Sequence, residues 1–258
     1  MKILVLVIVS FDKPVYYDML RLWRERILNN RFDSVDRCVT DGCVLDRCVT
    51  DVWFIQCKSD AEWIGDIVND IGDTHLRERF ELDMLNKTLF IRGDECLIPG
   101  ILHKTVEALS YFLRERSSLI IPPYNFVWRT NLSSVLDFEG LRRYLGTISS
   151  TGFYGGYVGK TVGEKDIWFA SGAGFLMSRD VAEYLVSNRD SLRWDLIDDV
   201  AIGALLEPRY GIVPIERCWI QSGEEVVGGN GVFHYRCESY QHLRTVEFMQ
   251  YVVRGLSK

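Results

Sequence analysis

Two periodicities of apolar residues alternate along the first half of the chain. Four segments carry the continuous apolar run that is typical of a buried strand: 2–10, 51–57, 87–93 and 124–128. Apolar residues recur at helical spacing in 11–30, in a short segment near 61–71 and in 99–116. Because strands and helices alternate, we expect an α/β protein with a mostly parallel, Rossmann-like central sheet and helices on both faces.

The second half of the chain has more glycine and a mixed pattern. Helical spacing occurs at 138–146, 179–188, 198–207 and 242–253, and strand-like segments occur at 152–159, 169–178, 211–216 and 231–236. No linker rich in proline, glycine or serine separates the halves. We therefore predict one domain over 1–258, with halves of about 1–134 and about 135–258.

Composition and charge narrow the class of protein. The 258 residues are 47% hydrophobic, which is enough for one sizeable core. The net charge of −6 argues against a nucleic-acid-binding surface, because such a surface needs a basic face. The N-terminal apolar run covers only Ile3 to Val9, so a buried strand fits it better than a signal peptide. No apolar run reaches the about 20 residues of a membrane helix, so we expect no membrane span.

The seven cysteines are an odd number scattered along the chain, which is typical of reduced thiols. This pattern predicts a cytoplasmic protein, either of the organism or of a virus-infected host cell. Three of the cysteines, Cys38, Cys43 and Cys48, belong to a repeat of DRCVTD at 36–51. Their spacing does not match that of paired zinc ligands, so we interpret the repeat as a duplicated loop without chemistry.

The fourth apolar strand ends in an unusual group of polar residues. Its apolar part, 126–128, continues without glycine or proline into Arg129, Thr130, Asn131, Leu132, Ser133 and Ser134. Ligands of parallel sheets bind at the carboxyl ends of the strands. We therefore expect a site where this end meets the strand ends at 10–12 and 57–60. The alternative is a turn that only caps the helix at 137–145.

Glycines and carboxylates mark two further candidate segments. Ser171, Gly172 and Gly174 precede an apolar strand, and Ser178 is expected to cap the helix after it. Those glycines either let a ligand approach the backbone or only bend the strand. Asp198 and Asp199 begin another helix. Helix capping needs only one of these carboxylates. The second can serve as a general base if this helix start faces a pocket.

Two features near the C-terminus complete the candidates. Strand alternation puts His234 and Arg236 on one face, so both can reach the same cleft. A lone strand histidine is nevertheless more often packed in a core than bound to a ligand. The glycine-rich loop at 222–231 contains Glu224 and Glu225, and it is either a lid or a solvated loop.

In this order, the segments resemble a GT-A glycosyltransferase of the β-1,3-galactosyltransferase and Fringe type. LHKTVEALSYFLRE and YNFVWRTNLSSVL are similar to the helix and the strand that precede and carry the family's metal-binding DxD motif. FASGAGFLMSRD, DDVAIG and FHYR are similar to three later segments. The resemblance covers roughly residues 85–240. It implies a GT-A-like fold whose first half binds a nucleotide sugar and whose smaller mixed lobe binds the acceptor.

The chain departs from this family at the metal site. On this resemblance, Asn131 and Ser133 stand where the DxD carboxylates belong, and RTNLSS resembles a variant of glycosyltransferase-like sequences of viruses and bacteria. Two arrangements are compatible with these residues. Asn131 and His234 can hold Mn²⁺ or Mg²⁺ weakly together with the donor diphosphate. Alternatively, Arg129 and Lys104 replace the metal, which we favour slightly. No organic cofactor is expected.

The resemblance implies inverting transfer of a sugar from a nucleoside diphosphate, such as UDP, to a hydroxyl group of a glycan acceptor. Asp199 or Asp198 is then the general base. The expected donor-binding residues are Ser10, Phe11, Asp60, Lys104, Arg129, Thr130, Asn131 and Ser133. The expected acceptor-binding residues are Trp168, Ser171, Gly172, Gly174 and Glu225. The alternatives are a non-catalytic sugar-binding or nucleotide-binding module and a nucleotidyltransferase, although the latter normally needs acidic metal ligands.

Overall fold

The computed structural model describes most of the chain. The described residues are 1–10, 14–29, 49–63, 78–115, 123–162, 166–225, 227–228, 231–237 and 243–256. Three sequence predictions therefore lie wholly or largely outside them: the role of Phe11, the helix near 61–71 and the repeat at 36–51.

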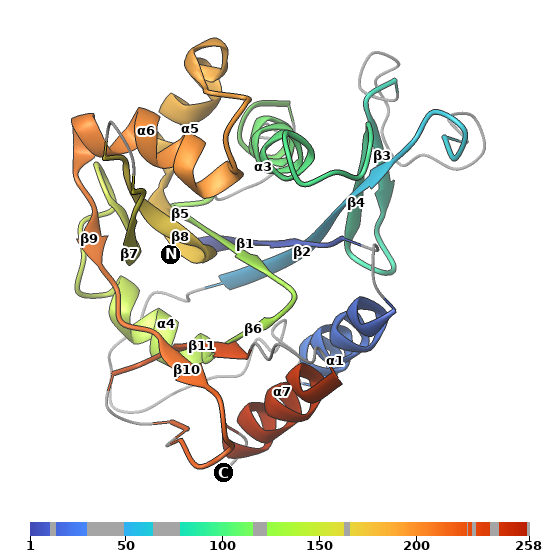
Figure 1. Cartoon of the computed structure of the whole chain (residues 1–258), viewed down its shortest axis with the longest axis vertical. Helices are drawn as coiled ribbons and strands as arrows, with labels where there is room; N and C mark the ends of the chain where they lie inside the picture. Colours follow the sequence, from blue (N-terminus) through green and yellow to red (C-terminus); the bar gives the residue numbers. More distant parts are fainter. Residues whose placement is uncertain are drawn as a thin grey trace, which may run out of the picture.

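An eight-stranded sheet forms the centre of the molecule (Figure 1). Its strand order is β3-β4-β2-β1-β5-β8-β7-β9. The strands are β1 (Lys2–Ile8), β2 (Val49–Lys58), β3 (Phe80–Asp83), β4 (Thr88–Arg92), β5 (Phe126–Asn131), β7 (Tyr154–Lys160), β8 (Trp168–Ser178) and β9 (Val213–Pro214). The pairs β4-β2, β2-β1, β1-β5 and β7-β9 are parallel, and the other three are antiparallel. The sheet is thus mostly parallel, as predicted, and contains strands from both halves of the chain.

The apolar run of β1 explains why both faces of the sheet are covered. Alternate side chains of a strand point to opposite faces, and almost every residue of β1 is buried. Leu4 and Leu6 belong to one core cluster, whereas Val5 and Val7 belong to a second. Burial on both faces is the pattern of a parallel strand between two helical layers.

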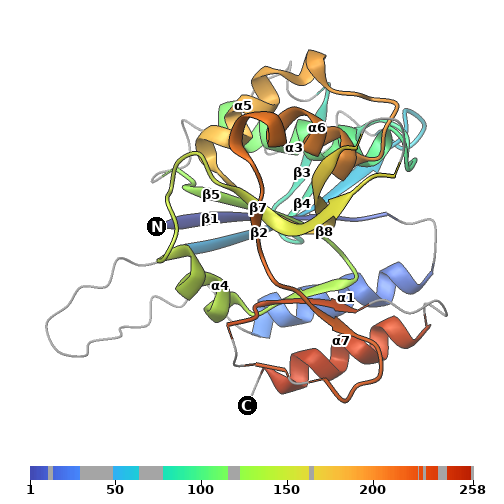
Figure 2. The same cartoon turned by 60° about the vertical axis from the view of Figure 1, so that its left-hand side comes forward.

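Helices lie on both sides of the central sheet (Figures 1 and 2). On one side lie α3 (Gly100–Ser110), α5 (Arg179–Ser187) and α6 (Asp198–Tyr210). On the other side lie α1 (Val15–Asn29), α4 (Phe138–Leu145) and α7 (Leu243–Gly255). Within the described segments, no helix has the length and apolar character needed to cross a membrane.

A second, three-stranded sheet forms the smaller mixed lobe that the sequence predicts. It contains β10 (Cys218–Ile220), β11 (His234–Cys237) and β6 (Ser134–Leu136), in that order. β11 pairs in parallel with β10 and antiparallel with β6. Because β6 follows β5 after only two residues, this small sheet lies next to the end of β5.

Three details differ from the predicted elements. Helix α3 continues into a π-helical turn at Tyr111–Glu115. The hydroxyl of Ser178 makes no capping hydrogen bond to α5; it accepts from the Phe153 N–H and donates to Asp180. The N-cap of α6 is Ile197 rather than an aspartate. Asp198 and Asp199 are the first two residues of the helix. Asp198 pairs with Arg129, whereas Asp199 accepts from the first-turn N–H of Val200.

Candidate functional site

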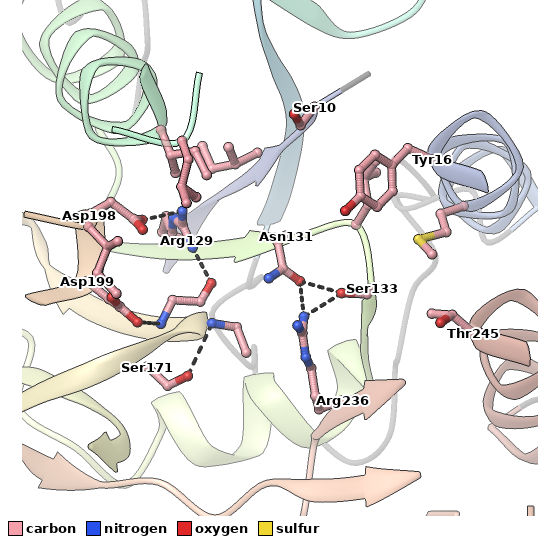
Figure 3. Close-up of a pocket in the computed structure, with 18 of the residues that line it drawn as sticks. Ser10, Tyr16, Arg129, Asn131, Ser133, Ser171, Asp198, Asp199, Arg236 and Thr245 are labelled. Carbon is pink, nitrogen blue, oxygen red and sulfur yellow. Dashed lines mark hydrogen bonds and ion pairs between the residues drawn. The ribbon is translucent and has the colours of Figure 1, made fainter. Parts of the chain in front are cut away.

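A pocket of about 480 Å³ lies at the carboxyl ends of β1 and β5 (Figure 3). The register pairs Ile8 with Asn131, so these parallel strands end at the same edge of the sheet. β8 runs antiparallel to β5 with Gly174 opposite Thr130, which brings Ser171 and Gly172 to that edge. The start of α6, the small sheet, α1 and α7 contribute the remaining walls. The sequence therefore predicted the correct edge for a pocket.

Arg129 and Asp198 form a buried ion pair in the pocket wall. The Arg129 side chain donates to the Asp198 carboxylate and to the carbonyl oxygen of Gly172. Only 2% of Arg129 and 8% of Asp198 are exposed. Since a buried charge is stable only when it is paired, each residue compensates the other. Arg129 thus lines the pocket, but its charge serves mainly to hold β5, β8 and α6 together.

Asp199 presents the second carboxylate to the pocket. Its Oδ2 accepts from the Gly172 N–H at 2.7 Å, and its Oδ1 accepts from the Val200 N–H at 2.9 Å. Burial raises the pKa of Asp199, and the neighbouring Asp198 carboxylate raises it further. The Gly172 N–H and Arg129 oppose this change without reversing it. A carboxylate with a raised pKa is a stronger base once it is ionised.

Asn131 and Ser133 hold an arginine at the end of β5. The Arg236 guanidinium donates to Asn131 Oδ1 at 2.6 Å and also to Ser133 Oγ. Asn131 Oδ1 additionally accepts from Ser133 Oγ at 3.2 Å. The Ser134 hydroxyl lies 3.3 Å from the same oxygen and donates to the Ala173 carbonyl at 2.8 Å. Figure 3 shows Asn131, Ser133 and Arg236 between the two aspartates on one side and Tyr16 and Thr245 on the other. A cationic group therefore occupies the centre of the pocket.

Arg217 brings a further guanidinium to the same pocket. It donates to Ser171 Oγ at 3.2 Å. Its guanidinium carbon lies 4.0 Å from the ring centre of Tyr157 and 5.0 Å from that of Trp219. Stacking of this kind orients an arginine and leaves its planar edge able to form hydrogen bonds.

The structure brings half of the predicted site residues together in the pocket. The following predicted site residues line the pocket: Ser10, Arg129, Asn131, Ser133, Ser171, Gly172, Asp198 and Asp199. The remaining described candidates lie elsewhere: Asp60, Lys104, Thr130, Trp168, Gly174, Glu225 and His234.

Lys104 is a buried structural residue in this arrangement. None of its side chain is exposed, and its ammonium group donates to the Val9 carbonyl at 2.7 Å and to both Glu95 oxygens at 2.9 and 2.6 Å. Asp60 forms an ion pair with Arg92 at 2.7 Å. Both side chains are therefore held by partners outside the pocket, and neither lines it.

Thr130 and Gly174 serve the packing between β5 and β8. The Thr130 hydroxyl is fully buried and donates to the Ala173 carbonyl at 2.7 Å. A Cβ atom at Gly174 would lie 2.6 Å from Trp128 and 2.8 Å from His234. The space beside this glycine is therefore filled by the protein itself rather than left for a ligand.

Two predicted acceptor-binding residues also make other contacts. The Glu225 carboxylate accepts from the N–H groups of Gln221, Ser222 and Gly223, so it organises its own loop. Trp168 is 45% exposed and lies beneath the Lys160 ammonium.

His234 is packed below the pocket. It is 1% exposed, its Nε2 lies 3.2 Å from Ser134 Oγ, and its ring meets Trp128 edge-on. The pKa of His234 is lowered to about 3, chiefly by burial and also by the charges of Arg217 and Arg236. The imidazole is therefore neutral. The strand alternation that suggested a shared cleft is borne out for Arg236 but not for His234.

Several pocket residues were not assigned a role from the sequence. Tyr16, Arg217, Trp219, Arg236 and Thr245 all line the pocket. Arg236 had a detectable signal, since it shares a strand face with His234. Arg217 and Trp219 had none, because only the folding of the small sheet brings β10 to the end of β5.

The donor groups at the predicted metal site do not fit a divalent cation. Asn131 Oδ1 already accepts from Arg236 and from Ser133, which uses both lone pairs of the amide oxygen. His234 is not directed at the pocket, and the part of the chain that the structure describes contains no group of three His, Cys, Asp or Glu residues with metal-binding geometry. Hard cations such as Mg²⁺ and Mn²⁺ bind mainly through carboxylate oxygens.

No family model and no curated protein matches the chain. Among solved structures, a glycosyltransferase involved in glycosylation of the major capsid of PBCV-1 has a TM-score of 0.48 and 8% identity, over 97% of this chain and 99% of that one. Mouse xyloside xylosyltransferase 1, apo form, has a TM-score of 0.39 and 9% identity, over 92% and 97% of the two chains. At these values, neither likeness supports an inference about this chain.

Proposed function

We propose that this chain is a glycosyltransferase that moves a sugar from a nucleoside diphosphate donor to an acceptor hydroxyl, with inversion at the anomeric carbon. One observation carries the proposal: Asp199, a carboxylate with a raised pKa, and the Arg236 guanidinium lie in the same pocket. Inverting displacement needs a base for the attacking hydroxyl and a positive group for the departing diphosphate.

The layout of the pocket supports a direction for the donor. Figure 3 shows Tyr16 and Thr245 on the far side of Arg236 from Asp199. In the proposed complex, the nucleoside lies toward Ser10 and Tyr16, and the diphosphate contacts Arg236. The sugar then extends toward Asp199. This orientation places the breaking bond between the positive group and the base.

The proposed step is a single displacement. Asp199 accepts the proton of the acceptor hydroxyl while the oxygen forms a bond to the anomeric carbon. The bond between that carbon and the diphosphate oxygen breaks, and its electron pair leaves with the nucleoside diphosphate. The Gly172 N–H and the Val200 N–H fix the carboxylate, so the base is oriented before the acceptor arrives.

The acceptor in this proposal lies against Ser171 and Trp219 at the mouth of the pocket. Trp219 is 43% exposed, so its ring offers an apolar face to a sugar. The Ser171 hydroxyl and the Arg217 guanidinium offer polar contacts for hydroxyl groups. An aromatic face beside a few directed polar groups is typical of small-ligand sites.

A panel of nucleotide sugars tests the proposed function. UDP-, GDP- and dTDP-sugars are incubated with the protein, and the release of nucleoside diphosphate is measured. We expect release from at least one donor, and a decrease of about 10²- to 10⁴-fold in Asp199→Asn. Asp195→Asn is the matched control, because Asp195 pairs with Arg193 on the surface and does not line the pocket.

Two results would contradict the proposal in different ways. Full activity of Asp199→Asn would exclude Asp199 as the base. Nucleotide binding without turnover of any donor would instead favour a non-catalytic binding module. This module is the main alternative function, because the neutral residues Asn131 and Ser133 stand at the positions of the carboxylates of the resembled enzymes.

A further inference from the structure

We propose that Arg236 is the centre of a metal-independent diphosphate site, at the strand end where the resembled family carries carboxylates. This inference rests on the proposed function, but it concerns binding rather than transfer. Asn131 and Ser133, at the positions of the missing carboxylates, both accept hydrogen bonds from Arg236. The Arg236 guanidinium thus lies beside Asn131 and Ser133, at the positions where the resembled family binds a metal ion through carboxylates.

Two neutral side chains orient the Arg236 guanidinium. Asn131 Oδ1 and Ser133 Oγ are neutral acceptors, so neither of these partners cancels the charge of Arg236. Ser133 donates to the same amide oxygen, which fixes the amide in turn. Carboxylates at these two positions would form an ion pair with Arg236 instead and weaken its attraction for phosphate.

Arg217 extends the positive region along the pocket. Its contact with Ser171 places it beside the segment of β8 that also faces Asp199. Arg217 and Arg236 both line the pocket, so it contains two guanidinium groups besides the paired Arg129. Guanidinium groups bind phosphate oxygens through two parallel N–H bonds, which a diphosphate can accept at more than one position.

Arg129 does not have this role, although the sequence favoured it. Its guanidinium is held by the Asp198 carboxylate and the Gly172 carbonyl inside the wall of the pocket. Lys104, the other predicted cation, is held by Glu95 outside the pocket. The hypothesis that an arginine replaces the metal ion is therefore kept, but we assign this role to Arg236 instead of Arg129.

Calorimetric titration with inorganic pyrophosphate and with UDP, in buffer containing EDTA, tests the site. We expect wild-type protein to bind both ligands under these conditions. Arg236→Met should weaken binding by roughly 10- to 100-fold, since it removes a charged hydrogen-bond donor. Arg236→Lys should bind with intermediate affinity, because it keeps the charge and loses the planar fork. Arg193→Met, on the surface and outside the pocket, should bind like wild type.

Asn131→Asp separates the arginine site from a weak metal site, and it should fold because it is isosteric and gains an ion pair with Arg236. If Arg236 binds the diphosphate, the new carboxylate weakens binding by roughly tenfold or more, and added Mn²⁺ does not restore it. If the strand end is a metal site, the new carboxylate strengthens binding in the presence of Mn²⁺. The second result would overturn the proposal.

The two proposals fail in distinguishable ways. Binding in EDTA that depends on Arg236, without turnover of any donor, would support the site and contradict the transferase. Turnover that requires Mn²⁺ and is unchanged in Arg236→Met would support the transferase and contradict the site.

Discussion

At the scale of single residues, the pKa of Asp199 is set by opposing neighbours. Burial and the charge of Asp198 raise it above the ordinary value of 3.8, and the Gly172 N–H and Arg129 only partly offset this. The base must be ionised to act, so activity is lost as the pH falls through the raised pKa. The sign is opposite for stability: the folded state disfavours ionisation, so ionising Asp199 costs stability as the pH rises from 3.8 through the raised pKa.

The pH dependence of transfer follows from this assignment. We expect an acid limb in the pH profile of kcat/KM at a pH above 3.8. Asp198→Asn removes the negative neighbour of Asp199, so the limb should move to lower pH. An unchanged limb in Asp198→Asn would contradict the assignment of Asp199 as the titrating base.

Lys104 tests whether the structural role of a predicted site residue is correct. Lys104→Met keeps the apolar stem but removes the ammonium donor of the Val9 carbonyl and the cation that pairs with Glu95, which then keeps only the Cys57 N–H among these donors. We expect a loss of about 1–3 kcal/mol in the free energy of unfolding, measured by urea denaturation. Lys160→Met is the control and should change stability by less than about 0.5 kcal/mol, because the Lys160–Asp166 pair is exposed. If Lys104→Met left stability unchanged and weakened diphosphate binding, the result would contradict the structural role and support the predicted role of Lys104 in donor binding.

At the scale of elements, the contact between α6 and β8 positions the proposed base. A Cβ atom at Gly203 of α6 would lie 2.5 Å from Phe169 Cβ and 2.6 Å from the Trp168 carbonyl oxygen. One of these atoms is backbone, so a side-chain rotation cannot relieve both contacts. Gly203 therefore lets α6 approach β8 closely enough for Asp199 to reach the Gly172 N–H.

Gly203→Ala should be destabilising despite its higher helix propensity. The propensity gain is about 1 kcal/mol, whereas overpacking costs about 1–3 kcal/mol. We expect a net loss of about 1 kcal/mol in thermal or urea unfolding, together with reduced kcat. Ala204→Gly in the same helix should cost about 1 kcal/mol without reducing kcat. If Gly203→Ala stabilised the protein, α6 and β8 could move apart to accept the methyl group, and the requirement for glycine at this contact would be contradicted.

The aromatic residue that contacts the acceptor should belong to β10 rather than to β8. Trp219 lines the pocket and Trp168 does not, although their exposures are similar. Trp219→Ala should raise KM for the acceptor by about tenfold with little change in donor affinity. Trp168→Ala should leave both constants unchanged. The reverse result would support the role that the sequence suggested for Trp168.

At the scale of the whole molecule, the sequence predicted the sheet because its central strands are long and apolar. β3, β6 and β10 were missed, since each has only three or four residues and shows no periodicity. The strand-end rule predicted that Ser10 and Asn131 lie close together, and both line the pocket.

The rest of the site depends on contacts that the sequence does not encode locally. Thr130 could have been separated from Arg129 and Asn131, because alternate residues of a strand face opposite sides. The burial of Lys104 could not be foreseen, since lysine is rarely buried and its partner Glu95 lies outside any periodic segment. Arg217 and Trp219 reach the pocket only through the pairing of β10 with β11.

The anomeric configuration of the released sugar tests the central claim most directly, and it does not require the natural acceptor. The protein is incubated with the donor that the panel identifies, and water serves as the attacking hydroxyl while proton NMR follows the first sugar to appear. The account predicts that this sugar has the configuration opposite to that of the donor, and that its formation is lost in Asp199→Asn. Release with retained configuration, or with the same rate in Asp199→Asn, would contradict direct displacement assisted by this carboxylate.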